Sequence, residues 1–163
     1  MTATWPVRRL GEEEWELYRA VRLAMLLDSP AAYGSSYARE AAFDEGTWRS
    51  RLGQRVLVVE RGGGLPLGTA TFLRLDPGDD PEIVAMWVAG HARGHGVADA
   101  LVGRCLEEAA ADGDEVLRLH VMLDNPRAVA FYGRAGFARD GGWGDAPGCA
   151  RMAAAVHEIL PDR

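Results

Sequence analysis

The chain has 163 residues, the length of a single domain, and 48% of them are apolar while 26% are charged. This composition excludes disordered and collagen-like proteins. All 18 basic residues are arginine. Because lysine is absent, the chain can form neither a lysine Schiff base nor a phosphate loop that ends in Gly-Lys-Ser or Gly-Lys-Thr. The net charge of -6 argues against nucleic acid as a partner, since sequence-independent binding requires a basic surface.

The first half of the chain predicts helices followed by strands. Apolar residues at spacings of three and four, among them Trp15, Val21 and Met25, indicate an amphipathic helix over residues 12–27. Asp44 is expected to cap a second helix that continues to Leu52, and the residues between the two helices, including 33–37, are expected to form a loop. Strands are predicted at residues 5–9, 55–60, 67–75 and 82–88, with a glycine-rich turn between 60 and 67.

In the second half, strands and helices alternate. Apolar residues recur in four-residue steps from Val97 to Ala109, which is typical of a helix that lies on a sheet. Further elements are predicted as a strand at 116–121, a helix at 126–135 with proline in its first turn, and strands at 137–139 and 149–156. Because the early strands pair as neighbours and the later ones alternate with helices, we expect a single α/β domain over residues 1–163 with a mixed sheet.

The segment from Arg93 to Ala98 joins a predicted strand to a predicted helix. Amides at a helix N-terminus lack intrahelical acceptors and favour an anion. Gly94 and Gly96 would let the backbone approach a pyrophosphate, and Arg93 could add a charge-assisted contact, although the same glycines also suit an ordinary turn. A dinucleotide fingerprint fails, because its third glycine would have to replace Asp99. The pattern therefore favours a pyrophosphate-bearing ligand of another kind.

Four segments, in order and spacing, resemble the GCN5-related N-acetyltransferase (GNAT) superfamily: Met86-Trp87-Val88, residues 93–98, Asn125-Pro126-Arg127-Ala128, and residues 131–137. The family's first signature is matched by Arg93, Gly96 and Ala98, and its second by Asn125, Tyr132, Gly136 and Phe137. The resemblance implies a mixed central sheet of about six to seven strands flanked by about four helices. It also implies acetyl-CoA as co-substrate, bound by Met86, Trp87, Val88, Arg93, Gly94, His95, Gly96, Val97, Ala98, Asn125, Ala128 and Tyr132.

The activity implied by the resemblance is N-acetyl transfer by direct attack of a primary amine, on a small molecule or a protein N-terminus, within a ternary complex. The oxyanion would be stabilised by a backbone N–H near Val88. Tyr132 is the candidate acid for the departing thiolate, and the alternative for this residue is simple packing beside Phe131. Glu82 and His120 are both candidate bases; the alternatives are a solvated acid at a strand end and a histidine of the sheet.

Other interpretations stay open. A non-catalytic acyl-CoA-binding or sensor module could use the same fold, and the phosphate loop does not specify the acyl group. His91 and His95 flank a glycine loop without a third ligand at suitable spacing, so no metal site is expected. Acceptor selectivity is expected in residues 31–42 and 141–148, the latter with Trp143 and Asp145. Dimerisation is a family expectation only.

The expected location is the cytoplasm. Cys105 and Cys149 are too few for a disulfide framework, which favours a reducing compartment. Residues 1–10 contain no apolar segment of the kind found in export signals, and no apolar run in the chain approaches the ~18 residues of a membrane span. We therefore expect no membrane partner.

Overall fold

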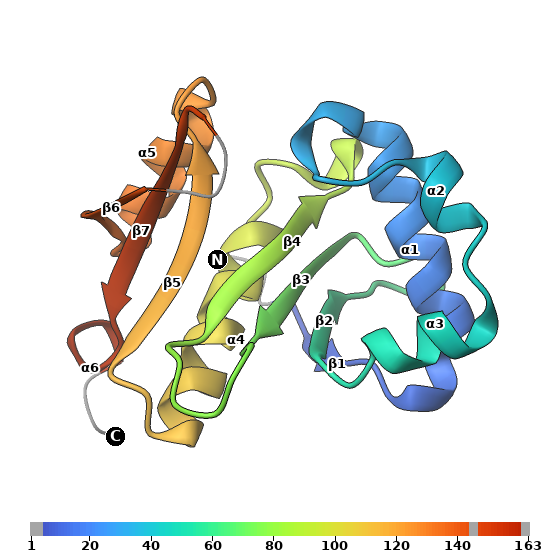
Figure 1. Cartoon of the computed structure of the whole chain (residues 1–163), viewed down its shortest axis with the longest axis horizontal. Coiled ribbons are helices and arrows are strands. Elements are labelled where there is room, and N and C mark those ends of the chain that lie inside the picture. The colour runs from blue at the N-terminus through green and yellow to red at the C-terminus, as the bar shows by residue number, and fades with distance from the viewer. Residues whose placement is uncertain (1–4, 144–146, 161–163) are drawn as a thin grey trace. The chain divides into compact units, whose positions relative to one another are not determined.

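The computed structural model describes residues 5–143 and 147–160. Strands and helices alternate along the second half of the chain, as Figure 1 shows. In chain order the elements are β1 (Val7–Arg9), η1 (Glu12–Glu14), α1 (Trp15–Asp28), η2 (Pro30–Ala32), α2 (Tyr37–Ala41), α3 (Glu45–Arg51), β2 (Arg55–Val59), β3 (Gly68–Leu73), β4 (Glu82–Val88), η3 (Gly90–Ala92), α4 (Val97–Asp112), β5 (Val116–Met122), α5 (Pro126–Arg134), β6 (Ala138–Trp143), β7 (Cys149–Ala155) and α6 (Val156–Ile159).

The strands of the described residues form a seven-stranded sheet in the order β1-β2-β3-β4-β5-β7-β6. Strands β4 and β5 run parallel, with Glu82 beside Arg118 and Ile83 beside Leu119. The pairs β1 with β2, β5 with β7 and β6 with β7 are antiparallel. The mixed α/β sheet predicted from the sequence is therefore confirmed.

The chain divides into two compact units, of which the first comprises Met1–Thr71 and Ala85–Leu101. In this unit α1 contacts both α2 and α3, which gather beside it in Figure 1. Its apolar face packs into two clusters of buried side chains, which consist of Leu10, Leu52, Val56 and Val58, and of Leu23, Leu26 and Trp48. These clusters hold α1 and α3 in place and thereby fix the segment between them.

A buried carboxylate links α1, α2 and α3 in the first unit. Glu40 on α2 is fully buried and accepts hydrogen bonds from Arg22 at 2.8 Å and from Arg51 at 2.9 Å. Burial by itself raises the pKa of the Glu40 carboxyl, but the hydrogen bonds and charges of its partners, Arg22 first, bring that pKa down to about 2. A buried charge with two cationic partners is stable only while those partners remain in place.

The second unit comprises Phe72–Val84 and Val102–Arg163. Strand β5 lies alongside β7, as Figure 1 shows, and α5 contacts β5. Leu117, Leu119 and Val121 on β5 are buried, whereas Arg118 and His120 between them are half-buried. This alternation places the apolar residues on one face of the strand and the polar residues on the other.

Three details differ from the sequence-based expectation. Helix α2 lies partly in the predicted loop. It is capped by Ser36, whose hydroxyl accepts from the amide of Arg39, and with five residues it is too short to give a periodic pattern. Residues 149–156 are predicted as one strand, but Val156 begins helix α6, whose four residues are also too few to give a periodic pattern. Strand β6 continues to Trp143 through two glycines, which are poor strand formers, because pairing with β7 outweighs their propensity.

Candidate functional site

The loop before α4 presents backbone amides without intrahelical acceptors. Helix α4 begins at Val97, and the amide of Ala100 donates to the carbonyl of Gly96 at 3.1 Å. The amides of Val97, Ala98 and Asp99 therefore have no carbonyl four residues earlier within the helix. Together with the helix dipole, these amides favour an anion at this end.

Two glycines give the loop its conformation. Gly94 and Gly96 have φ of 78° and 84°, in the left-handed region that favours glycine. A Cβ atom added to Gly94 would meet no atom of the described residues within 4 Å. The backbone beside Gly94 is therefore open to close approach, so this loop fits the diphosphate of a nucleotide-like ligand.

Arg93 is held at the start of this loop by two contacts within the first unit. Its Nε donates to the carbonyl of Val88 at 2.9 Å, and its Nη2 donates to Asp28 at 2.5 Å. Asp28 also accepts from the indole of Trp87 at 2.9 Å, and this hydrogen bond is the largest cause of the lowered pKa of its carboxyl. Arg93 remains 44% exposed in its side chain, which leaves part of the guanidinium accessible to an anionic ligand.

Two further predicted residues are held through their backbone carbonyls. The carbonyl of His95 accepts from the indole of Trp5 at 2.7 Å, and the His95 ring lies 2.9 Å from the carbonyl of Arg93. The carbonyl of Met86 accepts from the hydroxyl of Tyr33 at 3.0 Å. The segment 31–42, which the sequence assigns to acceptor selectivity, is thereby linked to β4.

Helix α5 carries the second predicted group of residues, in the second unit. Asn125 caps the helix, because its side chain accepts from the amide of Ala128 at 3.1 Å. Tyr132 is 9% exposed, and its ring makes edge contacts with Phe131 at 5.1 Å and Phe137 at 6.0 Å between centroids. The asparagine of the second signature therefore has a structural role at the helix start.

The structure brings the two candidate bases together. Glu82 on β4 and His120 on β5 belong to the second unit, and Oε2 of Glu82 lies 3.4 Å from Nδ1 of His120. Their side chains are 27% and 26% exposed, so a ligand can reach both. Sequence reasoning treated them as separate alternatives, because the parallel pairing of β4 with β5 is a long-range contact that no local pattern specifies.

The remaining predicted residues divide between the two units. The loop residues from Met86 to Ala98 belong to the first unit, whereas Glu82, His120, Asn125 and Tyr132 belong to the second. Asp145 lies outside the described residues.

Both cysteines are free and buried, and burial raises the pKa of the Cys105 thiol to about 12, which keeps that thiol protonated and inert.

The described residues contain no group of three or more histidine, cysteine, aspartate or glutamate side chains that could hold a metal ion. No helix in that part of the chain is both long enough and apolar enough to cross a membrane.

A mixed sheet in which a strand leads through a glycine loop to a helix N-terminus is an arrangement of proteins that bind diphosphate-bearing ligands. Residues 12–137 match the model of the acetyltransferase (GNAT) family, and the chain belongs to this family. Acetyl-CoA is the co-substrate of the family. Comparison with curated proteins gave no match.

Solved structures of this fold superpose over nearly the whole chain. A putative acetyltransferase from Salmonella typhimurium with acetyl-CoA is 18% identical, has a TM-score of 0.72, and the match covers 94% of this chain and 95% of that one. A spermidine N-acetyltransferase chimera from Vibrio cholerae is 20% identical, with a TM-score of 0.72 and coverage of 98% and 100%. A ribosomal-protein-alanine N-acetyltransferase from Brucella melitensis is 24% identical, with a TM-score of 0.69 and coverage of 92% and 99%. At these identities the likeness shows the fold alone.

The loop conformation can be tested by substitution. Gly96→Val is expected to weaken binding of acetyl-CoA roughly tenfold, because an L-residue in the left-handed region costs about 1–2 kcal/mol and would shift the loop toward another conformation. Isothermal titration measures the affinity. Gly103→Ala is the matched control, since Gly103 lies within α4, has no positive φ and has open space around it. Equal affinity of the Gly96 variant and the control would contradict the role of the loop.

Proposed function

We propose that this chain transfers the acetyl group of acetyl-CoA to a primary amine. The observation that carries the proposal is the loop before α4, where Gly94 and Gly96 adopt positive φ and the first helical amides lack intrahelical acceptors. This loop lies within the segment that matches the acetyltransferase family. A single domain over residues 1–163, a cytoplasmic location and dimerisation stay predictions.

The proposed reaction uses three side chains of the second unit, Glu82, His120 and Tyr132. Acetyl-CoA supplies the acetyl group as a thioester. The Glu82–His120 pair takes a proton from the ammonium form of the acceptor, so that the nitrogen lone pair becomes available for attack. As the C–N bond forms and the C–S bond breaks, the Tyr132 hydroxyl gives its proton to the departing thiolate. The acceptor nitrogen then loses its second proton, which restores the Tyr132 hydroxyl, and the products are an amide and free CoA thiol.

The two bases should act as one unit. Glu82→Gln and His120→Ala are each expected to lower kcat about 100-fold, and the double variant should be little worse than either single variant, because both remove the same proton transfer. Steady-state kinetics from pH 6 to 9 measure this. Multiplicative losses in the double variant would mean that the two residues act independently, and unchanged rates would exclude both as bases.

The proposed reaction is tested by measuring release of CoA thiol from acetyl-CoA with a panel of small amines, aminoglycosides and N-terminal peptides. Thiol release that depends on one class of amine is the expected result. If CoA binds tightly but no amine releases thiol, the chain is a non-catalytic acyl-CoA sensor and the proposed reaction is wrong. Propionyl-CoA and longer thioesters in the same assay determine which acyl group is preferred.

A further inference from the structure

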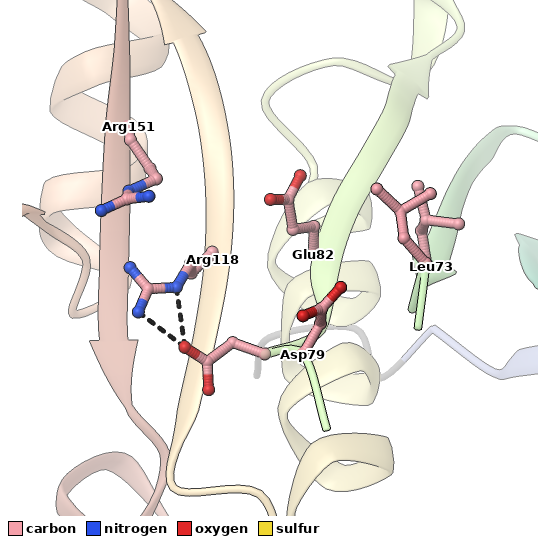
Figure 2. Close-up of a pocket in the computed structure, with 7 residues that line it drawn as sticks. Leu73, Asp79, Glu82, Arg118 and Arg151 are labelled. Carbon is pink, nitrogen blue, oxygen red and sulfur yellow. Dashed lines mark hydrogen bonds and ion pairs between the residues drawn. The ribbon is translucent and has the colours of Figure 1, made fainter. Parts of the chain in front are cut away.

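The second unit contains an open pocket with opposite charges on its two sides. Its volume is about 280 Å³, and it is lined by Leu73, Leu75, Asp79, Asp80, Glu82, Arg118 and Arg151. Figure 2 shows the guanidinium groups of Arg118 and Arg151 extending from β5 and β7, and the carboxylate of Glu82 extending from β4 on the other side. A volume just below the usual range of roughly 300–1,000 Å³ suits a small, polar ligand.

The strand register places Arg151 next to the proposed bases. Arg151 on β7 is the antiparallel partner of His120 on β5, and such partners have Cα atoms roughly 4.5–5.5 Å apart with side chains on the same face. His120 in turn lies 3.4 Å from Glu82. The proton acceptor for an amine and a cationic side chain are therefore immediate neighbours on one face of the sheet.

Arg151 has hydrogen-bond donors that Asp140 does not use. Its Nε donates to both oxygens of Asp140, at 3.0 and 2.8 Å, and its two Nη groups donate no hydrogen bond within residues 5–143 and 147–160. Arg118 instead uses its donors on Asp80 and on the same Asp140. The two guanidinium groups are balanced by the two carboxylates of Asp80 and Asp140, so an anion on this side would be held by hydrogen bonds. The Nη groups of Arg151 are donors whose fork geometry suits a planar carboxylate.

The opposite side of the pocket attracts a cation. The carboxylate of Asp79 makes no hydrogen bond or ion pair in the part of the chain that the structure describes, and the carboxylate of Glu82 has one ion pair there, with His120. Asp79 follows β3 and Glu82 begins β4, so both belong to the side facing β5 and β7 in Figure 2. An ammonium group bound here would lie beside the groups that must take its proton.

We propose that the acceptor is a free amino acid, whose ammonium group binds at Glu82 and His120 and whose carboxylate binds the Nη groups of Arg151. The pocket volume of about 280 Å³ limits the acceptor to a small molecule, the size class of a free amino acid. The inference rests on the proposed function and narrows its substrate class. This assignment disfavours protein N-termini as acceptors. In a peptide, the group beside the terminal amine is an uncharged amide, which cannot form the ion pair with Arg151.

Kinetics with a matched pair of substrates test the inference. Alanine and alaninamide differ only at the carboxylate, and their kcat/KM values are compared at equal concentrations of neutral amine. We expect a preference of at least about tenfold for alanine, as for a hydrogen-bonded ion pair, and Arg151→Gln should bring this ratio close to one by raising KM for alanine. In the control Arg139→Gln, an arginine on β6 outside the pocket, the ratio should stay at the wild-type value.

Equilibrium binding separates failure of this inference from failure of the proposed function. NMR titration of the protein with alanine and alaninamide reports binding without turnover. If alanine binds more tightly than alaninamide and Arg151→Gln removes the difference, the pocket binds amino acids. If, in addition, no amine releases CoA thiol, only the proposed reaction is wrong. If alaninamide binds or reacts as well as alanine, or if neither binds, the amino acid assignment is overturned while acetylation of other amines can still stand.

Discussion

Tyr132→Phe is expected to lower kcat for acetyl transfer about 100-fold, which is at the lower end of the range for general acid catalysis. The substitution removes the hydroxyl that would protonate the departing thiolate. It keeps the ring, which makes edge contacts with Phe131 and Phe137 and lies among the buried residues of the second unit. Stopped-time assays of CoA thiol release, with an amine that supports turnover, measure the change.

A control variant separates chemistry from packing. Phe131→Leu removes one of the two ring contacts of Tyr132 but leaves its hydroxyl, so kcat should stay within about threefold of the wild type. The affinity for acetyl-CoA and the thermal unfolding midpoint of Tyr132→Phe should also match the wild type. If kcat of Tyr132→Phe stays within twofold of the wild type across pH, Tyr132 is a packing residue and the acid is another group or water.

Glu40→Ala is expected to destabilise the fold by about 3 kcal/mol, the lower end of the range for breaking a buried ion pair. The variant leaves the guanidinium of Arg22, which is 11% exposed, without its carboxylate, and also removes a partner of Arg51. Urea denaturation followed by tryptophan fluorescence measures the free energy of unfolding. Glu45→Ala, which breaks the exposed pair with Arg49, should scarcely move the transition.

The same carboxylate predicts a dependence of stability on pH. The pKa of Glu40 is about 2 in the folded chain, below its ordinary value of 4.5. A lowered folded pKa means that the unfolded chain binds the proton more readily, so the stabilisation is complete above about pH 4.5 and is lost as pH falls toward 2. The wild type should therefore lose more stability than Glu40→Ala over this interval. Parallel curves for the two proteins would contradict the assignment.

Local signals in the sequence predicted the loop before α4 and the start of α5. The glycines at 94 and 96 predicted a turn that places backbone amides at a helix start, and Pro126 predicted the first turn of a helix; both depend on short-range geometry. That Asn125 caps this helix is a finding of the structure. The two missed helices, α2 and α6, have five and four residues, so their stability comes from tertiary contacts rather than from a periodic pattern.

The residues that define the acceptor pocket could not be predicted in the same way. Arg151 and His120 become neighbours only because β7 pairs with β5 and precedes β6 in the sheet order, which reverses the order along the chain. In the sequence, β5 alternates Arg118 and His120 with apolar residues, whereas β7 carries the single charged residue Arg151. Neither pattern identifies the partner strand.

The most direct test of acetyl transfer follows an isotope-labelled acetyl group from acetyl-CoA to product by mass spectrometry. Because the chain contains no lysine, its own side chains offer no primary amine that could capture the label. The predicted result is a labelled amide on the acceptor nitrogen in amounts equal to the CoA thiol released. Thiol released with the label recovered as acetate, or labelled acetyl-CoA recovered intact with every amine, would contradict the proposed function.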